Sequence, residues 1–97
     1  MAYRVVWSSK AIADVEAIAT YIARDSPSYA AAVVRKIIDN TRLLQQCPDK
    51  GKPIAEFADH SILEKAAYTY RIIYQIKDDL VIVAAIIHSK TLIDFET

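Results

Sequence analysis

The chain contains few of the residue types that define some common classes of protein. Its 97 residues include one glycine and one cysteine. A single cysteine, Cys47, excludes an intrachain disulfide and a thiolate metal cluster, and we expect it to be a small packing residue at a helix end. The glycine, Gly51, lies between Lys50 and Lys52 without the spacing of a phosphate-binding loop. We therefore expect a solvated loop here, and no metal or cofactor.

Neither sign of charge is in excess. Twelve lysines and arginines balance twelve aspartates and glutamates. Proteins that hold nucleic acid mainly through phosphate contacts usually carry a basic excess, so the balance disfavours an autonomous nucleic-acid-binding protein. The longest uncharged apolar run, residues 80–87, is too short to span a bilayer, and the N-terminal residues lack an apolar signal core. These features predict a cytoplasmic protein with no membrane contact.

The chain is organised around a predicted β-hairpin. Residues 70–77 and 80–88 are dense in β-branched and aromatic side chains, and Asp78 and Asp79 between them suit a tight turn. We expect Tyr70 and Tyr74 of this hairpin, and Trp7, to be packing residues. If the two strands pair without interruption from the turn onward, one face of the hairpin is predicted to face the core. It is made of the pairs Ile76–Val81, Tyr74–Val83, Ile72–Ala85 and Tyr70–Ile87.

The second face of this hairpin is predicted to be partly apolar and partly cationic, with His88 close to Arg71. A strand that is apolar on both sides normally lies inside a sheet that is covered on both faces. Helices supply one cover, and we expect a partner protein to supply the other. The predicted partner contacts are Arg71, Ile73, Ile82 and Ile86, with an intramolecular ion pair as the alternative for Arg71.

The rest of the chain predicts two helices and two further strands. Residues 3–7 and 62–68 read as strands, with Phe57 as an anchor against the core and residues 91–97 as a tail or helical turn. Ser8 or Ser9 can cap a first helix, and Ser26 followed by Pro27 can begin a second. The apolar stripes are Ile12, Val15, Ile18, Ala19 and Ile22 in the first helix, and Ala30, Val33, Val34, Ile37, Thr41 and Leu44 in the second.

This order of elements predicts an α+β fold in a single domain covering residues 1–97. We expect an antiparallel sheet of about three or four strands, with an N-terminal αα-hairpin packed on one face.

Several runs in this order resemble the ParE/RelE toxin superfamily. They are Val6-Trp7-Ser8 with the helix that follows, Ser26-Pro27 with Ala30, Gly51-Lys52-Pro53-Ile54, and the hairpin of residues 70–88. The resemblance implies a RelE/ParE-like fold and a plasmid-stabilisation type of toxin from a type II toxin–antitoxin system. It also implies a cognate antitoxin, encoded nearby, that neutralises the toxin in a hetero-oligomer.

Two activities occur within the superfamily. RelE-like members cut mRNA on the ribosome, and ParE-like members inhibit DNA gyrase. Metal-independent RNA cleavage needs an acid–base group and cations around the phosphate. The candidates for that chemistry are Lys52, Lys65, Arg71, His88 and Lys90.

Two departures from the RelE-like pattern favour the gyrase-inhibiting interpretation. Leu63 stands where relatives commonly carry a basic residue, and no tyrosine follows His88. We therefore favour a toxin that binds gyrase without chemistry of its own. A ribosome-dependent endoribonuclease and an inactive antitoxin-binding module are the alternatives.

Overall fold

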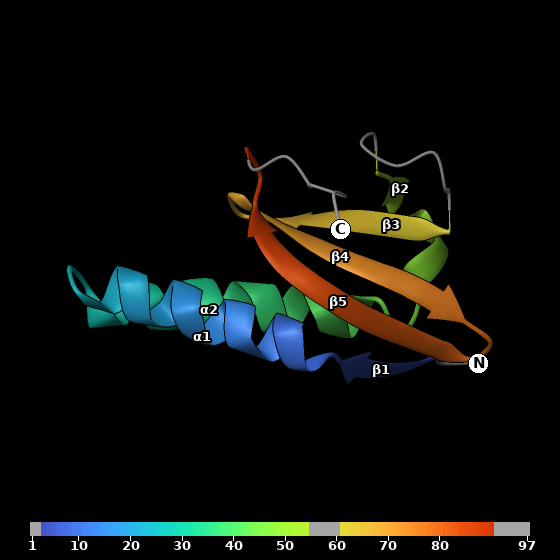
Figure 1. The fold of residues 1–97 in the computed structure, drawn as a ribbon, viewed down its shortest axis with the longest axis horizontal. Helices are drawn as coiled ribbons and strands as arrows, with labels where there is room; N and C mark the ends of the chain where they lie inside the picture. The colour runs from blue at the N-terminus through green and yellow to red at the C-terminus, as the bar shows by residue number, and fades with distance from the viewer. Residues whose placement is uncertain (1–2, 55–60, 91–97) are drawn as a thin grey trace.

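The computed structural model describes residues 3–54 and 61–90, apart from the side chain of Lys50. Phe57 and the tail of residues 91–97 lie outside this part of the chain. In order, the elements are β1 (Arg4–Trp7), α1 (Ser9–Ala23), α2 (Pro27–Leu43), the 3-10 helix η1 (Pro48–Lys50), β2 (Lys52–Pro53), β3 (Ile62–Ala67), β4 (Tyr70–Lys77) and β5 (Leu80–His88). The two helices lie against one face of the sheet (Figure 1). The predicted α+β class with a helical hairpin on one face is confirmed.

The sheet has five strands in the order β1-β5-β4-β3-β2. The predicted hairpin forms as β4 and β5, with Asp78 in the left-handed region at the turn, and β3 pairs with β4. The expectation of an antiparallel sheet was wrong for β1, which runs parallel to β5. Parallel pairing of distant segments requires a crossover, and α1 and α2 provide it. The sheet has one strand more than the three or four expected, because β2, which is only two residues long, forms in the predicted loop.

Both helices begin directly after serine residues that were predicted to cap them. The hydroxyl of Ser8 accepts a hydrogen bond from the Ala11 amide at 3.0 Å, and that of Ser26 accepts one from the Tyr29 amide at 3.1 Å. Five of the six residues predicted for the second stripe are buried, with Ala30, Val33, Ile37, Thr41 and Leu44 each at most 5% exposed. The sixth, Val34, is half-buried. In α1 the stripe was wrong at one position, because Ala11 is fully buried whereas Ile12 is 50% exposed.

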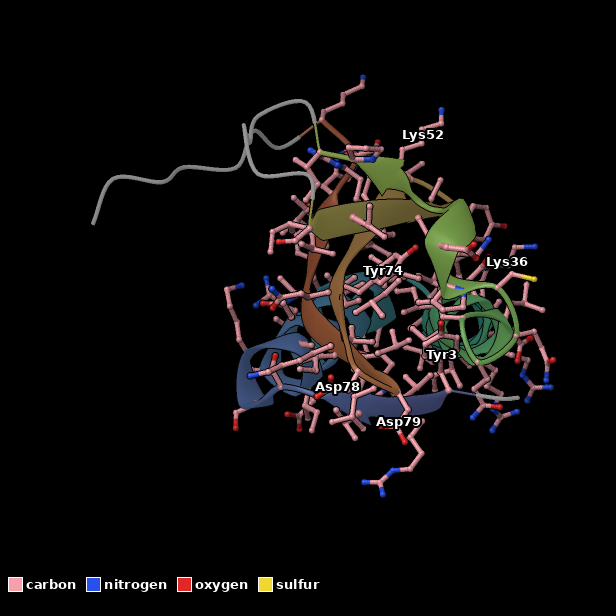
Figure 2. All side chains as sticks on the ribbon, turned by 90° about the vertical axis from the view of Figure 1, so that its right-hand side faces the viewer. Tyr3, Lys36, Lys52, Tyr74, Asp78 and Asp79 are labelled. Atoms are coloured by element: carbon pink, nitrogen blue, oxygen red, sulfur yellow. The ribbon has the colours of Figure 1, made fainter. Side chains whose placement is uncertain are left out.

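The core fills the space between the helices and the sheet. Its centre includes Val33 and Ile37 from α2 and Ile72, Tyr74 and Val83 from the sheet. Trp7 and Tyr70 pack against this cluster, so the aromatic residues of the strands act as packing residues, as predicted. Figure 2 shows Tyr74 pointing between the sheet and the helices, and the turn residues Asp78 and Asp79 beside β1. None of the helices in the described residues has the length and apolar character needed to cross a membrane.

A β-bulge in β5 changes which residues face the core. Tyr74 pairs with Val83 as predicted, but Ile73 pairs with Ala85, so Ala84 is an extra residue. Beyond the bulge the predicted pairing was wrong by one residue. Ile72 pairs with Ile86 and Tyr70 with His88. A one-residue slip moves side chains to the opposite face of a strand.

Helix α1 holds this bulge in place. The Ser8 hydroxyl donates to the Ala84 carbonyl at 2.8 Å, and the Asp14 carboxylate accepts from the Ile86 amide at 2.9 Å. Asp14 lies beyond the first turn of α1, which contains no acidic residue. These two contacts also set the rotation of α1 and turn Ala11, not Ile12, toward the sheet.

The segment between α2 and β3 packs around Tyr74. Its hydroxyl donates to the Pro48 carbonyl. A Cβ atom at Gly51 would lie 1.9 Å from the Tyr74 hydroxyl oxygen, so the single glycine is required for close packing. Cys47 was predicted to be a packing residue, but it is exposed. The chain turns sharply after α2, and Leu44 fills the core in its place.

Candidate functional site

The sheet face turned away from the helices, which we call the second face, contains a buried ion pair. Strand register assigns to it Glu64, Arg71, Ile73, Gln75, Ile82 and Ile87. Arg71 is only 8% exposed. Its guanidinium donates to both carboxylate oxygens of Glu64, from Nε at 3.1 Å and from Nη2 at 2.9 Å. Two alternative roles were predicted for Arg71, a partner contact and an intramolecular ion pair. The structure contains the ion pair.

The residues predicted to contact a partner do not all lie on the second face. Ile73 lies there but is 5% exposed, whereas Ile82 is half-buried and offers surface. The placement of Ile86 was wrong, because the bulge turns it into the core, where it is 3% exposed. Ile87 takes its place opposite Arg71 and is half-buried. The partner contact itself stays a prediction.

The structure separates the residues proposed for RNA cleavage. His88 pairs with Tyr70 on the helix-covered face, whereas Arg71 points to the second face, so the predicted proximity of His88 and Arg71 was wrong. Lys65 shares the face of His88, but β4 lies between their strands. Two strand spacings put their backbones roughly 10 Å apart.

The remaining candidates are placed at the edges of the molecule. Lys90 is exposed, and its backbone amide donates to Nδ1 of His88 at 3.2 Å. Lys52, on the edge strand β2, points into solvent (Figure 2). Lys52 and Lys65 line a hollow of about 500 Å³ together with Glu64 and Cys47. This hollow brings two of the lysines together, but neither Arg71 nor His88 lines it.

Tyrosines lie close to His88 where α2 packs against β3 and β4. The rings of Tyr70 and His88 contact edge to face, with centroids 5.6 Å apart, and those of Tyr29 and Tyr68 do so at 6.3 Å. Burial raises the pKa of Tyr70, and the phenols of Tyr29 and Tyr21 raise it further. A phenol with a raised pKa stays protonated at neutral pH, so Tyr70 is not suited to act as a general base.

A groove runs along the helical pair. It has a volume of about 710 Å³, and its lining includes Ala19 and Ala23 of α1 with Val34 and Ile38 of α2. Arg35, Asp39 and Arg42 are the charged residues that line it. Small side chains on one wall and branched apolar side chains on the other are suited to an amphipathic helix.

Glu64 and the gathering of tyrosines were not predicted from the sequence. The alternation of residues 62–67 indicates that Glu64 shares a face with Ala66, but its pairing with Arg71 depends on the register between β3 and β4. Tyr21 and Tyr29 were detectable as large aromatic residues off the apolar stripes of their helices. Their approach to Tyr68 depends on how the helical pair lies against the sheet.

Known structures share this arrangement of strand, helical hairpin and curved sheet. A chain from the chromosomal ParDE toxin–antitoxin system of P. aeruginosa matches with a TM-score of 0.76 and 20% sequence identity, over 91% of this chain and 97% of that one. A chain from the toxin–antitoxin complex RelBE2 of Mycobacterium tuberculosis matches with a TM-score of 0.60 and 24% identity, over 91% and 99%. The fold is thus that of the ParE and RelE class.

The sequence identifies one family within this class. The model of the family described as the ParE toxin of the type II toxin–antitoxin system, parDE, matches residues 5–93. The chain belongs to this family and is a ParE-type toxin of a toxin–antitoxin system. The resemblance inferred from the sequence is confirmed. None of the curated proteins matches the chain.

Proposed function

We propose that this toxin inhibits DNA gyrase by binding to it, without catalysing a reaction itself. A cognate antitoxin neutralises it by forming a hetero-oligomer. Residues 1–97 act as one toxin domain in the cytoplasm, where gyrase and its DNA are found. Membership of the ParE family supports this proposal, because ParE-like members of the superfamily inhibit gyrase.

The separation of Arg71 from His88 is the observation that favours gyrase binding over RNA cleavage. Cleavage of RNA without a metal needs an acid–base group and a cation at the same phosphate. Here the bulge in β5 turns His88 toward Tyr70, while Arg71 lies on the opposite face. The Arg71 guanidinium is also engaged by Glu64 through two hydrogen bonds. Recruiting it to a phosphate would break this ion pair and leave Glu64 without its cation.

For the antitoxin, two surfaces have the required apolar character. One is the part of the second face around Ile82 and Ile87, and the other is the groove that contains Val34 and Ile38. An amphipathic segment can cover surfaces of this kind. Because apolar patches and a net charge of zero favour self-association, we expect the isolated toxin to be less soluble than the complex. Static light scattering of both at equal concentration tests this.

The proposal is tested with purified toxin, DNA gyrase and relaxed plasmid DNA. We expect loss of supercoiling or accumulation of gyrase-cleaved DNA, and we expect relief when the antitoxin is added first. His88→Ala should leave the inhibition largely intact, since binding requires no proton transfer. Unimpaired supercoiling at a large excess of folded toxin would refute the proposal.

A further inference from the structure

Three exposed tyrosines come from three different elements. Tyr21 of α1 is 71% exposed, Tyr29 of α2 is 48% exposed, and Tyr68 in the turn between β3 and β4 is 56% exposed. In the described part of the chain, only two other large apolar side chains, Ile12 and Leu43, are exposed. Within the described residues, these tyrosines are therefore most of the exposed large apolar and aromatic side chains.

These tyrosines form one surface, which we call the tyrosine patch. The rings of Tyr29 and Tyr68 contact each other edge to face, with their centroids 6.3 Å apart. Tyr70 lies more deeply, and the phenols of both Tyr29 and Tyr21 are close enough to raise its pKa. Tyr70 in turn packs on His88. The patch consists of Tyr21, Tyr29 and Tyr68 with Tyr70 beneath them.

The backbone at Tyr68 indicates that the fold does not select for tyrosine there. Its φ is 62°, in the left-handed region, which glycine and asparagine occupy at lower cost. The side chain is more than half exposed, and its ring contact is with Tyr29, which is itself exposed. Neither local conformation nor core packing therefore accounts for a tyrosine at this position. The exposed ring is available for a contact outside the chain.

On each helix, the tyrosine of the patch points away from residues that line the groove. A helix turns about 100° per residue, so Ala19 and Ala23 are each about 160° from Tyr21 around α1. The same spacing separates Ala31, another residue of the groove, from Tyr29 around α2. One partner can thus occupy the groove while another contacts the patch.

The chemistry of the patch fits a folded protein. Tyrosine supplies large, rigid contact area with a polar hydroxyl, and it is enriched at the energetic centres of protein interfaces. A nucleic-acid surface needs cations for the phosphates, but the patch residues are neutral and the chain has no net charge. An amphipathic antitoxin segment is better suited to the alanine, valine and isoleucine of the groove.

We propose that the tyrosine patch is the surface with which the toxin contacts its protein target, and that the antitoxin binds away from it, in the groove and on the second face. This inference rests on the proposed function, in which the target is DNA gyrase. The toxin would then meet gyrase with aromatic side chains from both helices and from the β3–β4 turn.

The test uses Tyr21→Ala and Tyr68→Asn in the full chain, with Leu43→Ala as the control. Leu43 is also exposed, at 59%, but lies at the C-terminal end of α2. Tyr68→Asn should not lower the melting temperature, because asparagine tolerates the left-handed region. We expect each tyrosine variant to inhibit gyrase supercoiling at least tenfold less well, which corresponds to about 1.4 kcal/mol. Leu43→Ala should stay within twofold of wild type.

Growth arrest and copurification with the antitoxin encoded beside the toxin complete the test. The tyrosine variants should arrest growth less while still copurifying with the antitoxin. Unchanged potency of both folded variants, or loss of antitoxin binding in them, overturns the patch as the target surface. If wild-type toxin arrests growth without affecting supercoiling, the gyrase assignment fails. The patch is then tested by growth arrest alone: weaker arrest by the tyrosine variants supports it, and unchanged arrest overturns it. A wild-type chain with neither effect overturns both proposals.

Discussion

Asp14 is expected to stabilise the fold far more than its position on a helix surface indicates. Its carboxylate accepts a hydrogen bond from the Ile86 amide at 2.9 Å, at the bulge of β5. Asp14→Ala leaves that partly buried amide without a partner. A hydrogen bond to a charged group contributes roughly 1.5–3 kcal/mol, so we expect a loss of about 2 kcal/mol in the free energy of unfolding.

Asp14 also forms an ion pair with Lys10, at 3.0 Å, and this contribution has to be separated. The side chain of Lys10 is 66% exposed, and such pairs contribute about 0.3–0.5 kcal/mol. Lys10→Ala is therefore the matched control. For a domain of this size about 1 kcal/mol shifts the melting temperature by roughly 4–8 °C.

Thermal unfolding followed by circular dichroism measures both variants. We expect Asp14→Ala to melt about 8–16 °C below wild type and Lys10→Ala no more than about 4 °C below it. Asp14→Asn, which keeps an acceptor oxygen, should fall between them. Equal melting temperatures for the alanine variants would refute the conclusion that Asp14 anchors the bulge.

Three further predictions follow from single contacts. Gly51→Ala should lower the free energy of unfolding by about 2 kcal/mol in urea titrations, because the new Cβ overlaps the Tyr74 hydroxyl and Tyr74 is fully buried; wild-type stability would contradict this packing. Glu64→Gln should cost about 2 kcal/mol in the same assay, because the neutral amide accepts a weaker hydrogen bond from Arg71 than the carboxylate does, and a neutral effect would show that the ion pair is dispensable. Ile82→Asp should weaken antitoxin binding at least tenfold in calorimetry with the fold intact, whereas unchanged affinity would remove the second face from the antitoxin interface.

The features that local sequence determines were predicted well. Ser8 and Ser26 act as helix caps through contacts three residues away, and the β4–β5 turn depends on two adjacent aspartates. The stripe of α2 was also correct apart from the half-buried Val34, because the rotation of α2 follows from burying one continuous apolar side against the sheet. Each of these signals lies within a few neighbouring residues.

The errors arose where one element is positioned by a distant one. No local signal distinguishes Ala84 from Ala85, yet one extra residue in β5 moves Ile86 into the core and separates His88 from Arg71. The bulge depends on Ser8 and Asp14, which are more than seventy residues away along the chain. The parallel pairing of β1 and the approach of the tyrosines have the same origin, since both depend on how the helical pair lies against the sheet.

The most direct test of inhibition by binding is a side-by-side assay of one toxin preparation. The purified protein is titrated into a gyrase supercoiling reaction and, separately, into translating ribosomes with labelled mRNA. We predict that supercoiling is lost, with saturation near one toxin per gyrase binding site, and that no codon-dependent mRNA cuts appear. Cleavage of mRNA at substoichiometric toxin, abolished by His88→Ala or Arg71→Ala, with supercoiling intact, would contradict this account.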